Sequence, residues 1–402
     1  MPNAWLFIGV WVLGGLYALV GALSIAELGT AIPRSGGQYV FARRALGEYA
    51  GFIVGWSDWL STCGTTAAVA IVIGEYTGEL IPGLAGRTLT IASATAVGFA
   101  VLQWRGVTWG SRVQNLTSTL KALAFAGLIA ACFALGGGDA ASGSTPSPAV
   151  PTGLGLLFAL VLALQAVIYT YDGWTGVIYF SEEVRRPERD IPRSMFGGVL
   201  AIIVIYLLVN LALLYVLPLS RIAGEKLAVG AAAEVIFGAQ GDTVIRALTI
   251  VSMLSGINAY HLMATRVMLA MSRDRLFSVR AAKVNAGGTP TVALFVSTLA
   301  SLLFILSGTF EKVIAVLAFF FVANYTISFI SVFVLRWREP DLPRPYRAWG
   351  YPWTTALALL GSLAFLIGAA ASDTQNSLKA LLLLAVSYPA FLSLRWLARR
   401  GE

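Results

Sequence analysis

Apolar runs of membrane length recur from the start of the chain to its end. A membrane-spanning helix needs about 20 predominantly apolar residues, and by this rule we predict eleven spans. They occupy residues 4–26, 52–73, 88–104, 113–135, 153–180, 195–217, 243–270, 290–306, 313–335, 352–371 and 377–394. Because strands of a membrane barrel would be alternating segments of about ten residues, these runs predict an all-α integral membrane protein.

The composition agrees with this fold class and narrows the functions. Hydrophobic residues make up 57% of the chain and charged residues only 12%, against about 25% charged in soluble domains. The formal net charge of +8 falls in short clusters between apolar runs, which favours membrane topology over a nucleic-acid partner. Cys63 and Cys132 lie in apolar sequence without redox or metal-ligand spacing, so we expect buried thiols. With no nucleophile, phosphate-binding or dinucleotide motif, we expect no enzyme activity, cofactor or metal.

Basic residues also predict the orientation of the chain. Of the 28 lysines and arginines, 21 fall on the side that holds the first inter-span loop and the C-terminus, and six on the other side. The positive-inside rule therefore predicts a cytoplasmic C-terminus in a multi-pass protein of the cell (inner or plasma) membrane. The Gly/Ser/Pro-rich stretch 136–151 is expected to be an external linker.

The first span begins almost at Met1, with no acid or base before Glu27. Eleven spans with a cytoplasmic C-terminus place Met1 outside, although nothing basic is present to set that topology. We therefore expect one further helix ahead of the first predicted span, lost through a wrong start or a real truncation. A natural N-out protein is the alternative.

Ionisable residues within spans are costly in lipid, so they are functional candidates by default. Asp172 lies in "LQAVIYTYDGWTGVIYF", where Thr170, Gly173 and other polar or small residues interrupt a long span near its middle. This pattern predicts a discontinuous helix whose broken ends present backbone groups to a polar ligand. Glycines used only for close helix packing are the alternative, but they do not explain an aspartate at that depth.

Lys121 lies about nine residues into its predicted span. Burial disfavours the charged form of a lysine, so a lysine that faces a cavity can take up and release a proton near neutral pH. We expect a role in proton coupling. A permanent structural cation bound to backbone carbonyls remains the alternative.

Other polar groups receive structural interpretations. Asp58, flanked by tryptophans near one end of its span, is expected to have a helix-packing or interfacial role rather than a coupling role. His261 has no partner histidine or nearby acid, which favours a satisfied histidine at a helix interface over a proton relay. Glu75 and Glu79 are expected to be solvated at the external rim.

Four segments carry a resemblance to a known family. They are "GALSIAELGTAIPRSGGQYVFARRALG", "YDGWTGVIYFSEEVRRPERDIPRS", "NAYHLMATRVMLAMSRDRLF" and "RWREPDLPRPYRAWGYPW". They resemble four segments of the amino acid–polyamine–organocation superfamily. The first resembles the loop between the family's second and third helices, and the second resembles its sixth helix with the cytoplasmic exit. The third resembles the end of the eighth helix, and the fourth the segment between the tenth and eleventh helices. The resemblance runs from Trp5 to about Trp353.

This resemblance implies a LeuT-type bundle of twelve helices, ten of which form two inverted repeats, and it identifies the eleven spans as helices 2–12. Residues 1–136 would be the remainder of the first repeat, residues 153–335 the second repeat, and residues 350–396 two accessory helices of one transporter domain. The family's first helix, which holds part of its substrate site, would be absent.

The resemblance also implies roles for particular residues. Tyr169, Thr170, Tyr171, Asp172 and Gly173 would form the unwound substrate-binding segment, with Tyr169 as an aromatic gate. Thr65 would line the side-chain pocket. Lys121 matches a fifth-helix lysine that stands where sodium-coupled relatives bind sodium, and it occurs in both symporters and exchangers.

Together these observations predict secondary active transport of amino acids by alternating access. Transport would be sodium-independent and driven by a proton or a counter-substrate; the oligomeric state is left open. Two alternatives remain: a truncated relative that does not transport and is inactive or acts in sensing or assembly, and a polyamine carrier.

Overall fold

The computed structural model describes residues 3–136, 152–223, 225, 227–307, 310–372 and 374–400. Across these ranges the chain is helical, and the one β-type pairing is an isolated bridge between Val284 and Pro290. Eight helices of the described chain are long and apolar enough to cross a membrane. The predicted all-α membrane fold is confirmed.

Long helices form the body of the molecule, and short ones lie between them. The long helices are α1 (Ala4–Ala31), α3 (Glu48–Leu80), α4 (Thr88–Trp104), α5 (Val107–Leu135), α6 (Leu154–Tyr171), α7 (Pro187–Val216), α10 (Gln240–Arg273), α11 (Thr291–Ser307), α12 (Phe310–Arg338), α13 (Trp353–Ser372) and α14 (Thr374–Arg400). The short ones are α2 (Gln38–Leu46), α8 (Leu219–Ile222), α9 (Ala228–Phe237) and the 3-10 helices η1 (Pro82–Leu84), η3 (Gly176–Glu183) and η4 (Val279–Ala282).

Each of the eleven predicted spans falls on a helix, with three differences in form. The run 153–180 is not one helix, because α6 ends at Tyr171 and η3 follows after a break. Helices α4 and α11 have only 17 residues each. Helix α3 has 33 residues but carries polar side chains along its length, which makes it less apolar than the eight candidate spans. The predicted linker 136–151 lies, apart from Gly136, outside the described residues.

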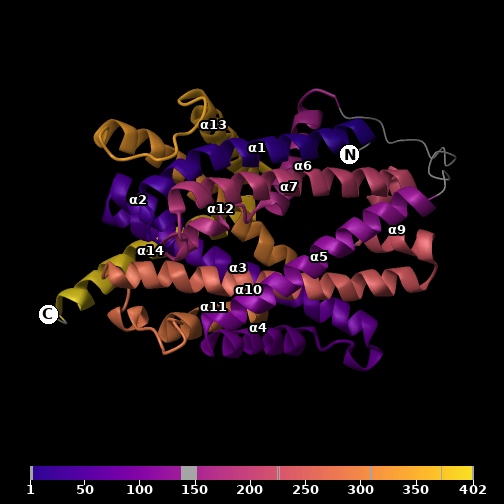
Figure 1. Ribbon diagram of the computed structural model, residues 1–402, viewed down its shortest axis with the longest axis horizontal. Helices are drawn as coiled ribbons and strands as arrows, with labels where there is room; N and C mark the ends of the chain where they lie inside the picture. Colours follow the sequence, from indigo (N-terminus) through magenta and orange to yellow (C-terminus); the bar gives the residue numbers. More distant parts are fainter. Residues whose placement is uncertain are drawn as a thin grey trace.

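Several of the long helices run along one common direction. In Figure 1, α1, α7 and α10 run along the horizontal axis, with α2 and the C-terminus at the left and the N-terminus and α9 at the right. Helix α3 packs along α10 and against α12, α1 packs along α7, and α5 crosses α10. The main buried cluster includes Phe41, Phe52, Phe320 and Phe329, which joins α2, α3 and α12.

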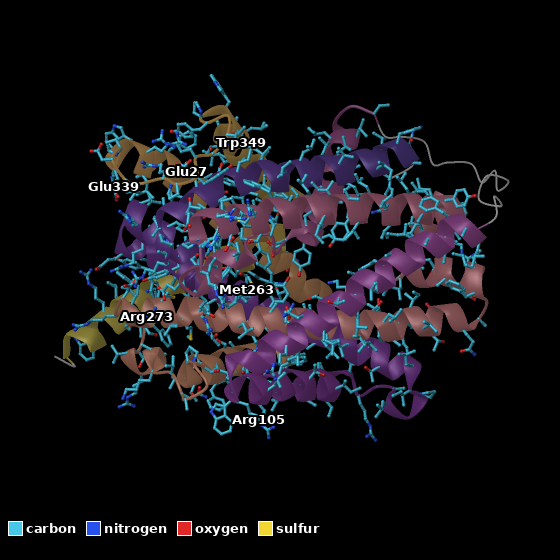
Figure 2. All side chains as sticks on the ribbon, in the orientation of Figure 1. Glu27, Arg105, Met263, Arg273, Glu339 and Trp349 are labelled. Carbon is cyan, nitrogen blue, oxygen red and sulfur yellow. The ribbon has the colours of Figure 1, made fainter. Side chains whose placement is uncertain are left out.

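A buried carboxylate fixes the chain at the left end of the bundle. Glu27 of α1 is 2% exposed and accepts hydrogen bonds of 2.8 and 2.6 Å from Arg336. Arg344 lies 3.3 Å away, and the Ala348 amide donates a further 2.7 Å bond. Figure 2 shows Glu27 and Glu339 at this end of the molecule. These contacts hold the connector between α12 and α13 against α1.

Candidate functional site

Helix α6 breaks at Asp172. The helix ends at Tyr171, Asp172 takes an extended conformation with φ −58° and ψ 155°, and Gly173 has φ +103°. Glycine adopts this backbone conformation readily because it has no Cβ. The chain resumes as η3 at Gly176. The discontinuous helix predicted from the polar and glycine residues of this stretch is therefore confirmed.

A cavity of about 360 Å³ borders the break. Thr170, Tyr171, Asp172 and Gly173 line it from α6, and Lys121 lines it from α5. The remaining wall comes from Ala18 of α1, from Trp174, Gly176 and Val177, and from Ser194, Met195, Gly198, Val199, Ile202 and Tyr206 of α7. The structure thus brings Lys121 and four of the five candidate residues of the break to one cavity.

Lys121 stands between this cavity and a smaller apolar one. The second cavity has a volume of about 80 Å³ and includes Phe125, Leu128 and Leu248. Among the described residues, no hydrogen-bond partner is found for Lys121, and its side chain is exposed and lines both cavities. The coupling role and the structural-cation role predicted from the sequence both stay predictions.

Tyr169, the fifth residue of the break, does not line the large cavity but a narrow one shared with Phe321 and Tyr325 of α12. Its ring packs on Phe321 with centroids 6.1 Å apart, and its side chain lies near that of Thr65 on α3, whose hydroxyl has no hydrogen-bond partner among the described residues. Thr65 is 3% exposed. The structure thus places Tyr169 and Thr65 together, between α6, α3 and α12, on the other side of the break from Lys121.

Aromatic residues hold both sides of the break. The Tyr325 hydroxyl of α12 donates to the Asp172 carboxylate, and Trp174 stacks on Tyr325 at 5.1 Å. The Tyr171 hydroxyl donates to the Trp11 carbonyl at 3.2 Å, while Tyr206 donates to the Thr170 carbonyl at 3.1 Å. Asp172 therefore already has a protein partner, and the last turn of α6 is fixed against α1 and α7.

Asp58 of α3 contacts the segment after the break. It is 1% exposed, and its Oδ1 atom accepts a 2.7 Å hydrogen bond from the Tyr179 hydroxyl of η3. Its Oδ2 atom is buried without a partner in the described part of the chain. This contact between α3 and η3 agrees with the helix-packing role expected for Asp58.

Two ion pairs join the end of η3 to α10. Glu183 accepts from Arg266 at 2.7 Å, and Glu182 accepts from Arg273 at 2.8 Å. Arg266 is 4% exposed, and its guanidinium group also lies over the Phe180 ring. These pairs and the Asp58 contact connect η3 to two long helices, α3 and α10.

The other sequence expectations have mixed outcomes. Cys63 and Cys132 are free and buried, as predicted. His261 is buried between helices, but neither ring nitrogen has a hydrogen-bond partner among the described residues, so the satisfied histidine was not found. Glu75 and Glu79 are exposed, as expected, and Glu79 also forms an ion pair with Arg246 of α10.

Sequence reasoning missed several residues of the site. Tyr325, Tyr206 and Tyr179 contact the break or the segment after it, yet a tyrosine in an apolar run carries no pattern that marks it as functional. Trp174 was the one available signal, since it lies within the polar interruption itself.

Comparisons with known proteins give consistent relatives. Residues 2–388 match the family model described as "Amino acid permease". The serine/threonine exchanger SteT of Bacillus subtilis (strain 168) is 30% identical over 394 residues, which cover 96% of this chain and 87% of SteT. The branched-chain amino acid permease BcaP of the same organism is 28% identical over 385 residues, covering 89% of this chain and 79% of BcaP. The large neutral amino acids transporter small subunit 2 of Mus musculus is 29% identical over 357 residues, covering 84% of this chain and 65% of that protein.

Proposed function

The chain belongs to the amino acid permease family, and from this premise we propose that it transports amino acids across the cell membrane. Transport proceeds by alternating access, without sodium, and is driven by a proton or by exchange for a second substrate. The C-terminus lies in the cytoplasm. The protein requires no cofactor, and its environment is the lipid bilayer.

The observation that carries the proposal is the broken helix beside a cavity. Half-helix ends at membrane depth present backbone N–H and C=O groups that helices otherwise satisfy internally, and an amino acid carries a carboxylate and an ammonium group that need such partners. The cavity of about 360 Å³ at the break is of a size that admits a small zwitterion. We assign substrate contact to the backbone of Tyr169–Gly173.

Side chains have separate roles in this proposal. Tyr169 is the proposed gate and Thr65 the proposed lining of the side-chain pocket; neither lines the cavity of about 360 Å³, so in these roles the substrate's side chain extends past the break toward α3 and α12. Lys121 is the proton-coupling group, because its amine faces the cavity that the break borders. The Asp172 carboxylate accepts a hydrogen bond from Tyr325, so we propose that Asp172 contacts the substrate through its backbone rather than through its side chain.

The division into two repeats is also proposed. Residues 1–136 form the remainder of one repeat, residues 153–335 the second, and residues 350–396 the accessory helices. The packing of α1 along α7 and of α3 along α10 supports this division, because each pair contains helices at corresponding positions of the two repeats.

Neutral amino acids are the proposed substrates. The printed names of the relatives refer to serine and threonine, to branched-chain amino acids and to large neutral amino acids. A polyamine carries at least two positive charges, whereas the cavity lining has one carboxylate, Asp172, and one ammonium group, Lys121. The name of SteT favours the exchange form of coupling.

The test uses the purified full chain in proteoliposomes. Uptake of labelled serine and leucine is measured with sodium or choline outside, with and without an inward proton gradient, and with liposomes preloaded with unlabelled amino acid. We expect equal uptake in sodium and choline, with stimulation by the proton gradient or by preloading. A sodium requirement would contradict the coupling proposal. Uptake no greater than in protein-free liposomes, for a broad panel of amino acids, would overturn the transport proposal in favour of a non-transporting relative.

A further inference from the structure

A second polar cavity lies at the arginine-rich end of the bundle, far from the break in α6. It has a volume of about 330 Å³ and lies between α2, the first turn of α3 and the residue that follows α10. Arg34, Arg43 and Arg44 line it, together with Glu48 and Asp274. Ile32, Val40 and Gly47 complete the lining, so the cavity combines three arginines and two acids with apolar groups, whereas the cavity at the break has one basic residue, Lys121.

Asp274 only partly neutralises Arg34 and Arg43. Asp274 is shared, because Oδ1 accepts from Arg34 at 2.7 Å and Oδ2 lies 3.1 Å from Arg43. The Tyr39 hydroxyl also donates to Oδ2, at 2.8 Å. One carboxylate thus serves two guanidinium groups and one hydroxyl, so positive charge remains in excess on this side of the cavity.

The contacts around the cavity also involve more arginines than carboxylates. Arg44 pairs with Glu339 at 2.6 Å, and Glu48 pairs with Arg395 of α14 at 3.6 Å. Arg338 donates to the Ala45 carbonyl at the end of α2. Across these described contacts, five arginines face three carboxylates. A guanidinium group pairs readily with a phosphate, because its planar N–H groups match the phosphate oxygens.

Exposed aromatic residues lie beside this cavity. Tyr49 at the start of α3 packs edge-on against Tyr388 of α14, with ring centroids 5.3 Å apart, and both are partly exposed on the outer surface. Trp396 of α14 is 51% exposed nearby in sequence. Amphipathic aromatic side chains gather at the membrane–water interface, and apolar side chains such as Leu392 continue along α14.

We propose that this cavity binds the phosphate group of an anionic phospholipid, such as phosphatidylglycerol, whose acyl chains lie along the exposed apolar side chains of α14. The guanidinium groups of Arg34, Arg43 and Arg44 receive the phosphate. Basic pockets beside membrane helices attract anionic headgroups in this way. The site depends on the membrane location of the chain and is independent of the transport proposal. Figure 2 shows Glu339 and Arg273 at this end of the bundle.

Native mass spectrometry of the detergent-solubilised full chain tests the proposal. The protein is titrated with phosphatidylglycerol and, separately, with phosphatidylcholine of the same acyl chains. We expect one phosphatidylglycerol to bind with at least tenfold higher affinity than phosphatidylcholine. Arg43→Gln with Arg44→Gln removes charged donors and is expected to weaken phosphatidylglycerol binding by tenfold or more. The matched control is Arg87→Gln, an exposed arginine before α4 at the other end of the bundle, which should leave binding unchanged.

Each other outcome has a defined meaning. Arg44→Gln alone keeps both contacts of Asp274, so it provides a folded variant if the double substitution does not fold, and it should still weaken binding. Equal binding of the two lipids, or equal binding by the Arg44 and Arg87 variants, overturns the proposal. Displacement of phosphatidylglycerol by millimolar glycerol 3-phosphate or inorganic phosphate identifies a free phosphate as the ligand and overturns the lipid assignment.

Discussion

The Tyr179 hydroxyl donates a 2.7 Å hydrogen bond to Asp58 Oδ1, which joins η3 to α3 inside the bundle. Tyr179 is 2% exposed and Asp58 is 1% exposed, so water cannot replace either partner without a rearrangement. Because η3 directly follows the break in α6, this bond fixes the downstream side of the candidate substrate site to a helix on the opposite side of the bundle.

We expect Tyr179→Phe to lower the free energy of unfolding by about 1–3 kcal/mol, because it removes the only described donor to a buried carboxyl group. Thermal unfolding of the detergent-solubilised protein measures this change. Tyr215→Phe, at an exposed tyrosine of α7, is the matched control. In a double-mutant cycle with Asp58→Asn, the two substitutions should be non-additive; additivity would show that the two side chains do not interact.

A larger loss of stability is expected at Glu27. Glu27→Gln removes the charge that neutralises Arg336 and Arg344, and breaking one partner of a buried ion pair costs about 3–5 kcal/mol. We therefore expect a strongly reduced melting temperature and a poor yield of monodisperse protein. If the Glu27→Gln protein has the same melting temperature as the wild type, the connector after α12 is held by other contacts.

Glu339→Gln is the matched control for Glu27→Gln, and its effect on stability should depend on pH. The hydrogen bond from Arg44 holds the pKa of Glu339 below its usual range. A depressed folded-state pKa stabilises the fold above the unfolded-state pKa and ceases to do so as the pH falls through the folded-state value. Glu339→Gln should therefore cost at most about 1 kcal/mol at neutral pH, as for an exposed pair, and nothing at strongly acidic pH. A cost that grows as the pH falls would contradict this assignment.

Features that depend on residues close together in the sequence could be predicted, whereas contacts between residues far apart in the sequence could not. The break in α6 was predictable because Asp172 and Gly173 are local signals that a membrane helix cannot continue unchanged. Helix α9 was not, because ten apolar residues are too few for the length rule. The partners of Asp58 and Glu27 were also out of reach, since they lie 121 and 309 positions away and no local pattern specifies such pairs. Lys121 was marked by its charge within an apolar span, whereas the resemblance to a family brought Tyr169 and Thr65 into consideration; only the fold showed that Lys121 lines the cavity at the break and that Tyr169 does not.

Gly173 provides a sharp test of the broken helix. Its φ of +103° is unfavourable for any residue with a Cβ, although space for that atom is open. Gly173→Ala should therefore change the backbone of the break without a steric clash and abolish most amino acid uptake in proteoliposomes. Gly176→Ala is the matched control, because Gly176 lines the same cavity and also has open space but no positive φ. Equal uptake by the two variants would exclude a role for the backbone conformation at Gly173.

Lys121→Ala separates proton coupling from substrate binding. The amine faces the cavity at the break, and its removal leaves Asp172 as the ionisable carboxyl group in that lining, already engaged by Tyr325. We expect the variant to insert into the membrane and to lose the pH dependence of uptake, whereas Lys379→Ala, at a lysine on α14 that contacts Asn376, should behave as the wild type. Exchange by preloaded liposomes should persist in Lys121→Ala if the lysine acts in coupling alone. If instead uptake keeps its full pH dependence, the proton acts at another group, and Asp58, with one unpartnered buried oxygen next to η3, becomes the residue to substitute next.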